Sequence, residues 1–161
     1  MSEHDKLVRK AAAWLRQRNC VIVITEMASG NEEADAIGFK NVSILIECKA
    51  SRSDFFSDKK KNFRREPKMG MGQYRYYMTP VGLFTEDEIP DGWGWIEVKS
   101  NRAMLRRKAP IHSAYNHRKE RALLMSTIRR IGQSAPKCVS VRHYTYRTKN
   151  RASLGVAKYV D

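Results

Sequence analysis

The chain has 161 residues, 42% of them hydrophobic, and its 31 Lys and Arg against 17 Asp and Glu give a formal net charge of +14. This size fits one soluble globular domain, and no apolar run approaches the ~20 residues that a membrane-spanning helix needs. The first residues, MSEHDKLVRK, lack the apolar core of a signal peptide, so we expect a cytoplasmic protein with no membrane partner. The three cysteines and four histidines show no spacing typical of a disulfide framework or a zinc knuckle.

The positive charge is unevenly distributed along the chain. Residues 99–161 hold 16 of the 31 basic residues and two of the 17 acidic ones, so they carry the whole excess. A neutral first part and a strongly cationic second part indicate a polyanionic partner, most simply nucleic acid. An acidic membrane surface or an acidic protein is the alternative, but neither explains the carboxylates described below.

The N-terminal segment predicts a helix over Asp5–Arg18, because apolar residues recur at helical spacing and basic residues take the other face. Ser2 or Asp5 would cap it. A strand is expected over Val21–Thr25, followed by a loop over Met27–Asn31.

Two further strands are expected at Ala34–Phe39 and Val42–Ile46, joined by a turn at Lys40 and Asn41. They predict an antiparallel hairpin that brings Asp35 beside Glu47. Because side chains alternate along a strand, Glu47 and Lys49 should point to the same face.

Paired carboxylates at a strand end suit a hard divalent cation such as Mg²⁺, which takes oxygen ligands and keeps several waters. A lysine beside them would position or deprotonate a water, or neutralise charge that builds up on a phosphate. The plainer alternative is that Glu47 and Lys49 form a cross-strand salt bridge at the surface.

The segment after Lys49 predicts a helix over Asp54–Arg64 that opens with a capping box at Ser51. A helix N-terminus favours phosphate, so Arg52 and Ser53 are candidate phosphate contacts, with capping as the alternative role for the serines. Asp58 either orients Lys49 or pairs on the helix surface.

The remainder of the chain predicts strands at the aromatic run YRYYM, at Trp93–Val98 and at Asn101–Arg107, then a basic helix over Ser113–Ile131. The C-terminal tail alternates and would add one or two strands. Its basic residues lie among aromatic ones, a pattern that suits nucleic-acid binding, although an ordinary charged edge hairpin is the alternative. The candidate nucleic-acid contacts there are Arg142, Arg147, Lys149 and Arg151.

The spacing Asp35-x11-Glu47-x-Lys49 resembles the core of the PD-(D/E)xK nuclease superfamily, with Ala34 where the name has proline. The later segments SRSDFFSDKK, YRYYM, GLF and GWGWIEV are similar to one small bacterial and phage branch, in which MmcB-like DNA-repair proteins look closest. The resemblance covers residues 33–98. It implies catalytic roles for Asp35, Glu47 and Lys49, and a Mg²⁺ (or Mn²⁺) ion held by Asp35, Glu47 and the backbone carbonyl of Cys48.

Three accessory residues are also candidates, Glu33 from strand alternation as a secondary metal ligand on the face of Asp35, and Asp5 and Tyr77 from the resemblance, and each has a plainer alternative. Glu33 lies two residues before Asp35 and is otherwise a solvated loop charge. Asp5 stands where some members supply an extra acid, but it also suits helix capping. Tyr77 and Gln73 have a spacing found on a helix of RecB-like nucleases, whereas aromatic alternation here favours a strand.

We therefore expect an α/β protein with a restriction-endonuclease-like core: a central mixed sheet of four to five strands flanked by helices, with a basic C-terminal extension. Residues 1–110 would form the nuclease-like core, and residues 111–161 a basic helix plus a nucleic-acid-binding extension of the same compact domain. The expected activity is metal-dependent hydrolysis of DNA in repair, recombination or phage DNA processing, in a bacterial or phage-infected cell. The alternative is a non-catalytic DNA- or RNA-binding protein on a nuclease scaffold. No small-molecule ligand is expected, and the sequence does not predict an oligomeric state.

Overall fold

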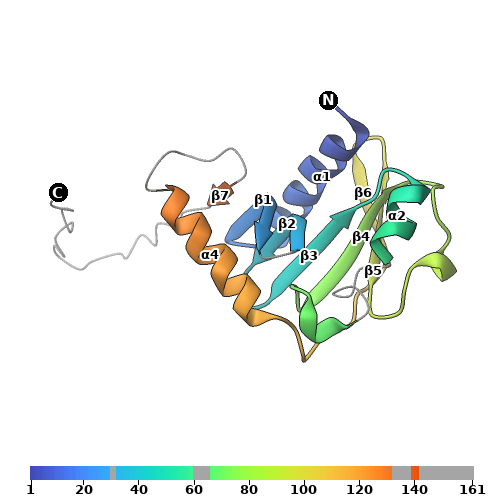
Figure 1. The fold of residues 1–161 in the computed structure, drawn as a ribbon. Coiled ribbons are helices and arrows are strands. Elements are labelled where there is room, and N and C mark those ends of the chain that lie inside the picture. The colour runs from blue at the N-terminus through green and yellow to red at the C-terminus, as the bar shows by residue number, and fades with distance from the viewer. Residues whose placement is uncertain (30–31, 60–65, 132–138, 142–161) are drawn as a thin grey trace, which may run out of the picture.

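The computed structural model describes residues 1–29, 32–59, 66–131 and 139–141 as a mixed seven-stranded sheet with helices on both faces (Figure 1). The strand order is β6-β5-β4-β3-β2-β1-β7. The strands are β1 (Ile22–Ser29), β2 (Glu32–Phe39), β3 (Ser43–Cys48), β4 (Tyr74–Pro80), β5 (Gly94–Lys99), β6 (Arg102–Arg107) and β7 (Val139–Val141). β4 runs parallel to both β3 and β5, and all other neighbours are antiparallel.

The α/β class and the mixed sheet agree with the sequence-based expectation, but the expected four to five strands are too few. The strand expected at Asn101–Arg107 joins the sheet as β6 beside β5, and a strand from the C-terminal tail joins it as β7 beside β1, so the described sheet has seven strands. The predicted hairpin is confirmed as β2–β3, and the aromatic run is confirmed as strand β4.

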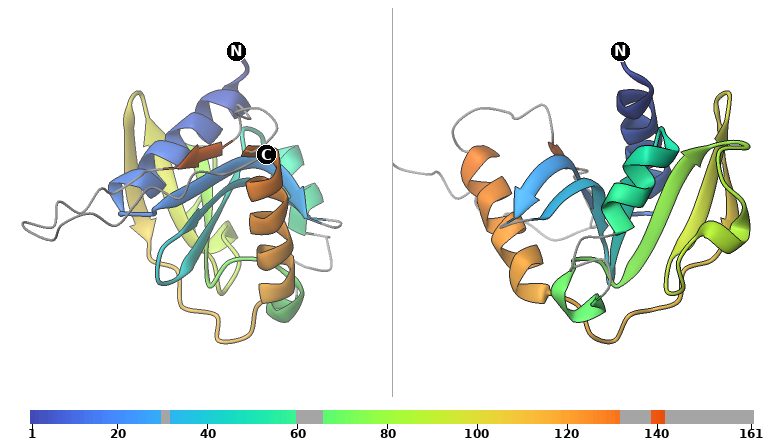
Figure 2. Two further views of the ribbon diagram at one scale, coloured as in Figure 1. Left: turned by 90° about the vertical axis from the view of Figure 1, so that its left-hand side faces the viewer. Right: turned by 45° about the vertical axis from the view of Figure 1, so that its right-hand side comes forward.

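Three α-helices lie within the described residues, and they divide between the two faces of the sheet (Figure 2). They are α1 (Glu3–Gln17), α2 (Arg52–Lys59) and α4 (His117–Ile131), accompanied by the short 3-10 helices η1 (Pro67–Met69) and η2 (Glu86–Glu88). α1 packs on one face with a core that includes Ala36, Ile46 and Met78. α2 and α4 contribute Phe55 and Leu123 to a second core on the opposite face.

Helix α1 forms because its apolar residues repeat at helical spacing and its first turn is capped. The buried residues are Leu7, Val8, Ala11, Ala12, Trp14 and Leu15. The Asp5 main-chain N–H donates to the Ser2 hydroxyl, 3.1 Å away, and the Ser2 N–H donates to the Asp5 carboxylate, 2.8 Å away. This reciprocal capping box satisfies two helix donors that would otherwise lack partners.

The centre of the sheet is β3, whose six residues are all buried, as expected for a strand covered on both faces. Next to it, β4 carries Arg75 with only 1% of its surface exposed. Its guanidinium donates to the carbonyl oxygens of Pro67, Gly70 and Gly72, at 2.6, 2.9 and 3.0 Å. The buried charge therefore fixes the loop that leads into β4.

Some predicted boundaries are wrong. β1 continues to Ser29, where a loop was expected from Met27, because it pairs with β2 again from Met27 to Ser29, beyond the unpaired Glu26. α4 begins at His117 rather than Ser113, since the Asn116 side-chain oxygen accepts the Lys119 N–H and caps the helix there. α2 begins at Arg52, two residues before the predicted start, and the predicted helix end at Arg64 lies outside the described residues.

Helix α4 is anchored on β1 through polar contacts. The Ser29 hydroxyl donates to the Lys119 carbonyl oxygen, 2.9 Å away, and the Thr127 hydroxyl lies 3.3 Å from the Met27 sulfur.

Across the described ranges of the chain, the structure contains no helix with both the length and the apolar character to cross a membrane.

Candidate active site

Asp35 and Glu47 meet at the end of the β2–β3 hairpin. Ala36 pairs with Ile46, so the antiparallel register places Asp35 opposite Glu47. The main-chain N–H of Cys48 donates to Asp35 Oδ2 over 2.7 Å. The Asp35 carboxylate thus accepts a main-chain hydrogen bond at the point where the β2–β3 pairing ends. This hydrogen bond holds the carboxylate beside the end of β3.

A break in the β1–β2 ladder positions Asp35. Glu26 lies opposite Asp35, has a φ of 51°, and does not pair with it, although its neighbours Thr25 and Met27 pair with Ala36 and Ala34. Ile24 and Met27 then pack in the same core cluster, although an odd separation on a regular strand would place them on opposite faces. A non-glycine residue at positive φ costs about 1–3 kcal/mol, and such strain clusters at functional sites.

Lys49 lies at the centre of a carboxylate cluster and is only 4% exposed. Its ammonium is 3.6 Å from Asp58 Oδ1, 3.7 Å from Glu47 Oε2 and 3.8 Å from Asp54 Oδ1. Burial alone would lower the pKa of Lys49, but the surrounding carboxylates, Glu47 foremost, outweigh it and raise that pKa above its usual value. Lys49 is therefore a protonated, fixed cation at neutral pH, and the surface salt bridge considered above is instead a buried one.

Tyr77 lies next to this cluster on β4, opposite Glu47 in the parallel register. Its hydroxyl donates to Asp58 Oδ2 over 3.2 Å, and its ring stacks on Trp93 at a centroid distance of 4.3 Å. Tyr77 is a strand residue, as the aromatic alternation predicts, and it orients Asp58 against Lys49.

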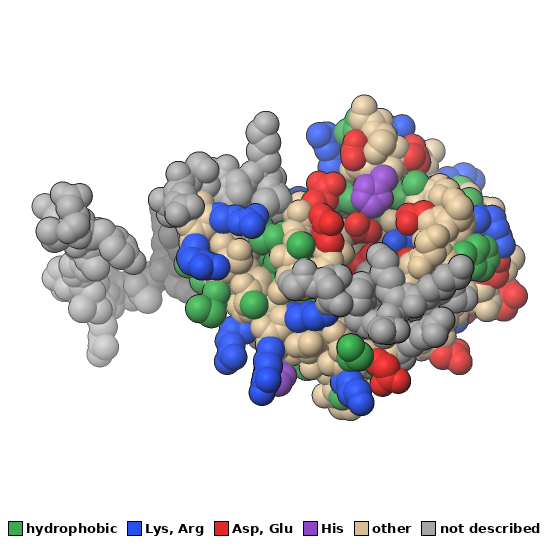
Figure 3. Space-filling view, in the orientation of Figure 1, with side chains coloured by type: hydrophobic (Ala, Val, Ile, Leu, Met, Phe, Trp, Pro, Cys, Tyr) green, Lys and Arg blue, Asp and Glu red, His purple; other side chains and the backbone are tan. Residues whose placement is uncertain are grey.

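The N-terminus of α1 brings a histidine to the site instead of an acid. His4 Nε2 lies 3.5 Å from Asp35 Oδ1, whereas Asp5 is engaged in the capping box. The Ser2 main-chain hydrogen bond, followed by the Ser2 hydroxyl, lowers the pKa of the Asp5 carboxyl. Figure 3 shows acidic side chains gathered around a histidine between the N-terminal end of α1 and α2. Sequence reasoning missed His4, because a lone histidine in a first helical turn has no recognisable spacing.

Arg52 and Ser53 lie at the start of α2. The Arg52 guanidinium donates to both carboxylate oxygens of Glu88, one at 3.0 Å, and to the Leu83 carbonyl oxygen at 3.1 Å. The hydrogen bond from Arg52 is the main reason that the pKa of the Glu88 carboxyl falls to about 2. The Ser53 hydroxyl lies 3.1 Å from that of Ser51, whose oxygen accepts the Asp54 N–H at 3.3 Å, so Ser51 caps the helix as predicted.

The remaining candidates lie further from the cluster or beyond the described residues. Glu33 is exposed on β2, opposite Ala28 of β1. The candidate nucleic-acid contacts of the tail, Arg142, Arg147, Lys149 and Arg151, fall outside the described residues, as does Cys138.

The donor set at the strand end fits a hard divalent cation. Because the N–H and C=O of a strand residue point to the same side, the Cys48 carbonyl oxygen faces the side of β3 on which Asp35 lies. Two carboxylates and one carbonyl are oxygen ligands, and Mg²⁺ usually completes its shell with water and substrate phosphate. Among the residues that the structure describes, no three His, Cys, Asp or Glu side chains form a metal-binding group, so any cation here would depend on the carbonyl and on water.

Comparisons with known proteins give the fold and no activity. No family model matches the chain, and no curated protein matches it. A solved structure of a protein of unknown function from Silicibacter pomeroyi is similar, with a TM-score of 0.63 and 22% sequence identity. The similarity covers 81% of this chain and 90% of that protein. The two proteins share an α/β fold with a mixed sheet.

Proposed function

We propose that this protein is a metal-dependent nuclease that hydrolyses phosphodiester bonds of DNA. The observation that carries the proposal is the meeting of Asp35, Glu47 and Lys49 at the end of β3. Asp35 lies opposite Glu47 and accepts the Cys48 N–H, and the Lys49 ammonium lies 3.7 Å from Glu47. Burying a cation and carboxylates at the end of an apolar strand is costly, which argues for a use beyond stability.

The Asp35 and Glu47 carboxylates and the Cys48 carbonyl oxygen would hold Mg²⁺ or Mn²⁺. When bound, such an ion acts as a Lewis acid on a phosphoryl oxygen and makes a bound water a stronger nucleophile. Asp35 is positioned for this role by the Cys48 N–H at 2.7 Å and by His4 at 3.5 Å, so its carboxylate is fixed before any ligand arrives.

Lys49 serves in this proposal as an electrostatic group rather than as a proton acceptor. Its raised pKa keeps it protonated, with Glu47 the first of the carboxylates that offset the effect of burial. A fixed ammonium at this place stabilises the negative charge that develops on the phosphoryl oxygens as the bond breaks. Asp58, held by the Tyr77 hydroxyl at 3.2 Å, keeps the ammonium in position.

The resemblance to the PD-(D/E)xK superfamily supports the same conclusion, since its motif residues are the ones that the fold brings together. The finer fold assignment, a restriction-endonuclease-like core, is part of this proposal and rests on that resemblance together with the mixed sheet and the β2–β3 hairpin.

The test is a cleavage assay on single-stranded, duplex and branched DNA, with Mg²⁺, with Mn²⁺ and with EDTA. Wild-type protein should give products only with metal, and Glu47→Gln should lose at least about 100-fold in rate, because the metal would lose a charged oxygen ligand and with it the transition-state stabilisation that the metal supplies. Asp87→Asn, an equivalent change at an exposed residue of η2, is the matched control and should cleave as wild type. Metal-dependent products that persist unchanged in Glu47→Gln would refute this site. Binding without products under any metal would favour the non-catalytic DNA- or RNA-binding alternative.

A further inference from the structure

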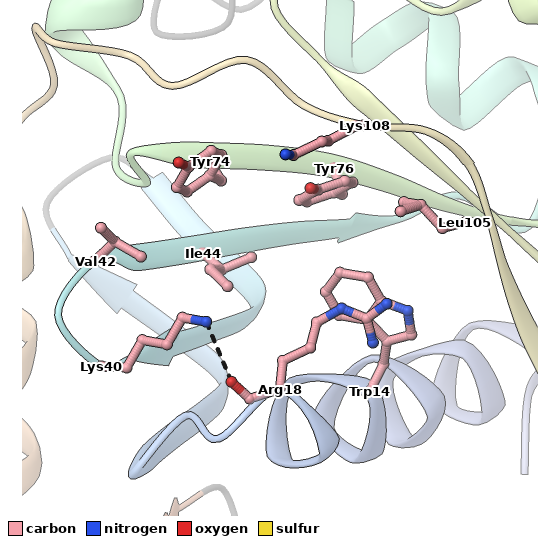
Figure 4. A pocket seen from close by; sticks show the side chains of 9 residues that line it. All are labelled: Trp14, Arg18, Lys40, Val42, Ile44, Tyr74, Tyr76, Leu105 and Lys108. Carbon is pink, nitrogen blue, oxygen red and sulfur yellow. Dashed lines mark hydrogen bonds between the residues drawn. The ribbon is translucent and has the colours of Figure 1, made fainter.

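A groove lies between α1 and β6, on the face of the sheet opposite α2 and α4. It consists of two hollows of about 340 and 330 Å³ that share Trp14 as a common wall. β3 and β4 form the floor of the first hollow. In both hollows, the C-terminal half of α1 forms one wall, and β6 with the residues next to it forms the other. Figure 4 shows side chains of α1, β3, β4 and β6 converging on the first hollow.

All the charged side chains of described residues that line the groove are positive. Lys10 and Arg102 line one hollow, and Arg18, Lys40 and Lys108 line the other, and no described Asp or Glu lines either hollow. Within the described part of the chain, none of these five cations lies within 4.0 Å of a carboxylate, whereas Lys49, Arg52 and Arg106 all do. Five cations that no carboxylate neutralises form a site for several negative charges placed in a row.

Flat side chains lie beside the cations in the first hollow. The Arg18 guanidinium lies over the Trp14 ring, 3.3 Å from its centroid, and the Lys40 ammonium donates to the Arg18 carbonyl oxygen over 3.2 Å (Figure 4). Tyr74 is half-buried and lines the same hollow. The outer face of a flat guanidinium and a tyrosine ring are surfaces on which an unpaired base stacks.

We infer that this groove binds single-stranded nucleic acid, with phosphates on Lys40 and Lys108 and bases against Tyr74 and the Arg18 guanidinium. A single strand is favoured over a duplex, because stacking on recessed rings requires bases that are free of their partners. A strand is favoured over a free nucleotide, because five cations spread over two neighbouring hollows exceed what one nucleotide would contact. The inference goes beyond the proposed function and needs no cleavage, so it is tested in EDTA.

The experiment measures binding of a fluorescently labelled 12-nucleotide single strand by anisotropy, over a series of salt concentrations. The double variant Lys40→Gln/Lys108→Gln should weaken binding and reduce the slope of log K against log salt by about 1.4, since each phosphate contact to a single strand contributes about 0.7. The matched control is Arg118→Gln/Arg121→Gln, which removes the same charge from exposed positions on α4, on the other face of the sheet. That control should change the slope by less than half as much.

Base stacking is tested separately at Tyr74. Tyr74→Leu should weaken binding at least about fivefold, because stacking on one aromatic ring contributes about 1–3 kcal/mol per base, whereas Tyr74→Phe should bind as wild type. Thermal unfolding of each variant confirms that it is folded. Equal loss in the groove and α4 variants would overturn the inference, as would duplex that competes as well as single strand or a mononucleotide that competes as well as the oligonucleotide. Failure of cleavage with intact groove binding would count against the proposed nuclease alone.

Discussion

At the scale of single residues, the charge state of Lys49 depends on the carboxylates around it. It is buried among Glu47, Asp54 and Asp58, and their charges keep it protonated in spite of burial. Its folded pKa lies above the usual 10.5, so the stability that its charge supplies is fully present below pH 10.5 and is lost as the pH rises through the folded value.

Replacement of Lys49 by Met should destabilise the fold in a pH-dependent way. The variant leaves Glu47 and Asp58 buried without their cation, and breaking a buried ion pair costs about 3–5 kcal/mol. The loss should be largest near pH 8 and smaller near pH 11.5, because wild type gives up the stabilising Lys49 charge as the pH rises through the raised pKa of that residue. Urea unfolding at both pH values measures this difference. An equal loss at the two pH values would show that charge is not the cause.

The two buried cysteines, Cys20 before β1 and Cys48 in β3, should be chemically inert. Burial, followed by the charges of Asp35 and Glu47, raises the pKa of the Cys48 thiol well above its usual value, and burial also raises that of Cys20. In a Cys138→Ser variant, neither remaining thiol should react with iodoacetamide at pH 8 over hours, because the thiolate is the reactive form. Full reaction should follow in guanidinium chloride. Rapid labelling of the native variant would contradict the burial of both side chains.

At the scale of elements, α4 is held against the sheet by Glu120. Its Oε1 atom accepts the Ser43 hydroxyl and the Gly72 N–H, both at 2.7 Å, and so links α4 to β3 and to the loop before β4. Glu120→Ala should lower the free energy of unfolding by about 2–4 kcal/mol, because two buried donors lose their acceptor. Arg121→Ala, at the exposed neighbouring position, should change it by less than about 0.5 kcal/mol. Urea unfolding compares the two, and equal midpoints for Glu120→Ala and wild type would refute this role.

Elements with strong local signals were predicted well from the sequence. The amphipathic repeat of α1, the apolar run of β3 and the aromatic alternation of β4 each reflect one face or one buried segment. The continuation of β1 past Glu26 was missed, because a positive φ at a glutamate leaves no trace in the hydrophobic pattern. The parallel pairing of β3 with β4 was equally invisible, since residues 49–73 separate the two strands.

The residues of the candidate site were likewise predictable only where local sequence patterns place them. Asp35, Glu47 and Lys49 follow from a hairpin and from strand alternation, which are local properties. The approach of His4 from α1 and of Asp54 from α2 depends on how helices dock on opposite faces of the sheet, so it required the three-dimensional structure.

At the scale of the whole molecule, the sheet separates two regions of different chemistry. The carboxylate cluster lies at the C-terminal end of β3 near α2, whereas the groove of unneutralised cations lies beside the C-terminal half of α1, on the other face. The net charge of +14 therefore coexists with an acidic site, and a nucleic acid would be attracted by the basic surfaces while the carboxylates hold a cation.

The most direct test of the account is a titration with Mn²⁺, followed by the electron paramagnetic resonance signal of the free ion, on wild type, Asp35→Asn and Asp87→Asn. We expect wild type and Asp87→Asn to bind one Mn²⁺ per chain, and Asp35→Asn to bind at least about tenfold more weakly, because it loses a charged oxygen ligand. Thermal unfolding should show all three proteins folded. Binding by Asp35→Asn that equals wild type would contradict the assignment of Asp35, Glu47 and the Cys48 carbonyl as the metal site.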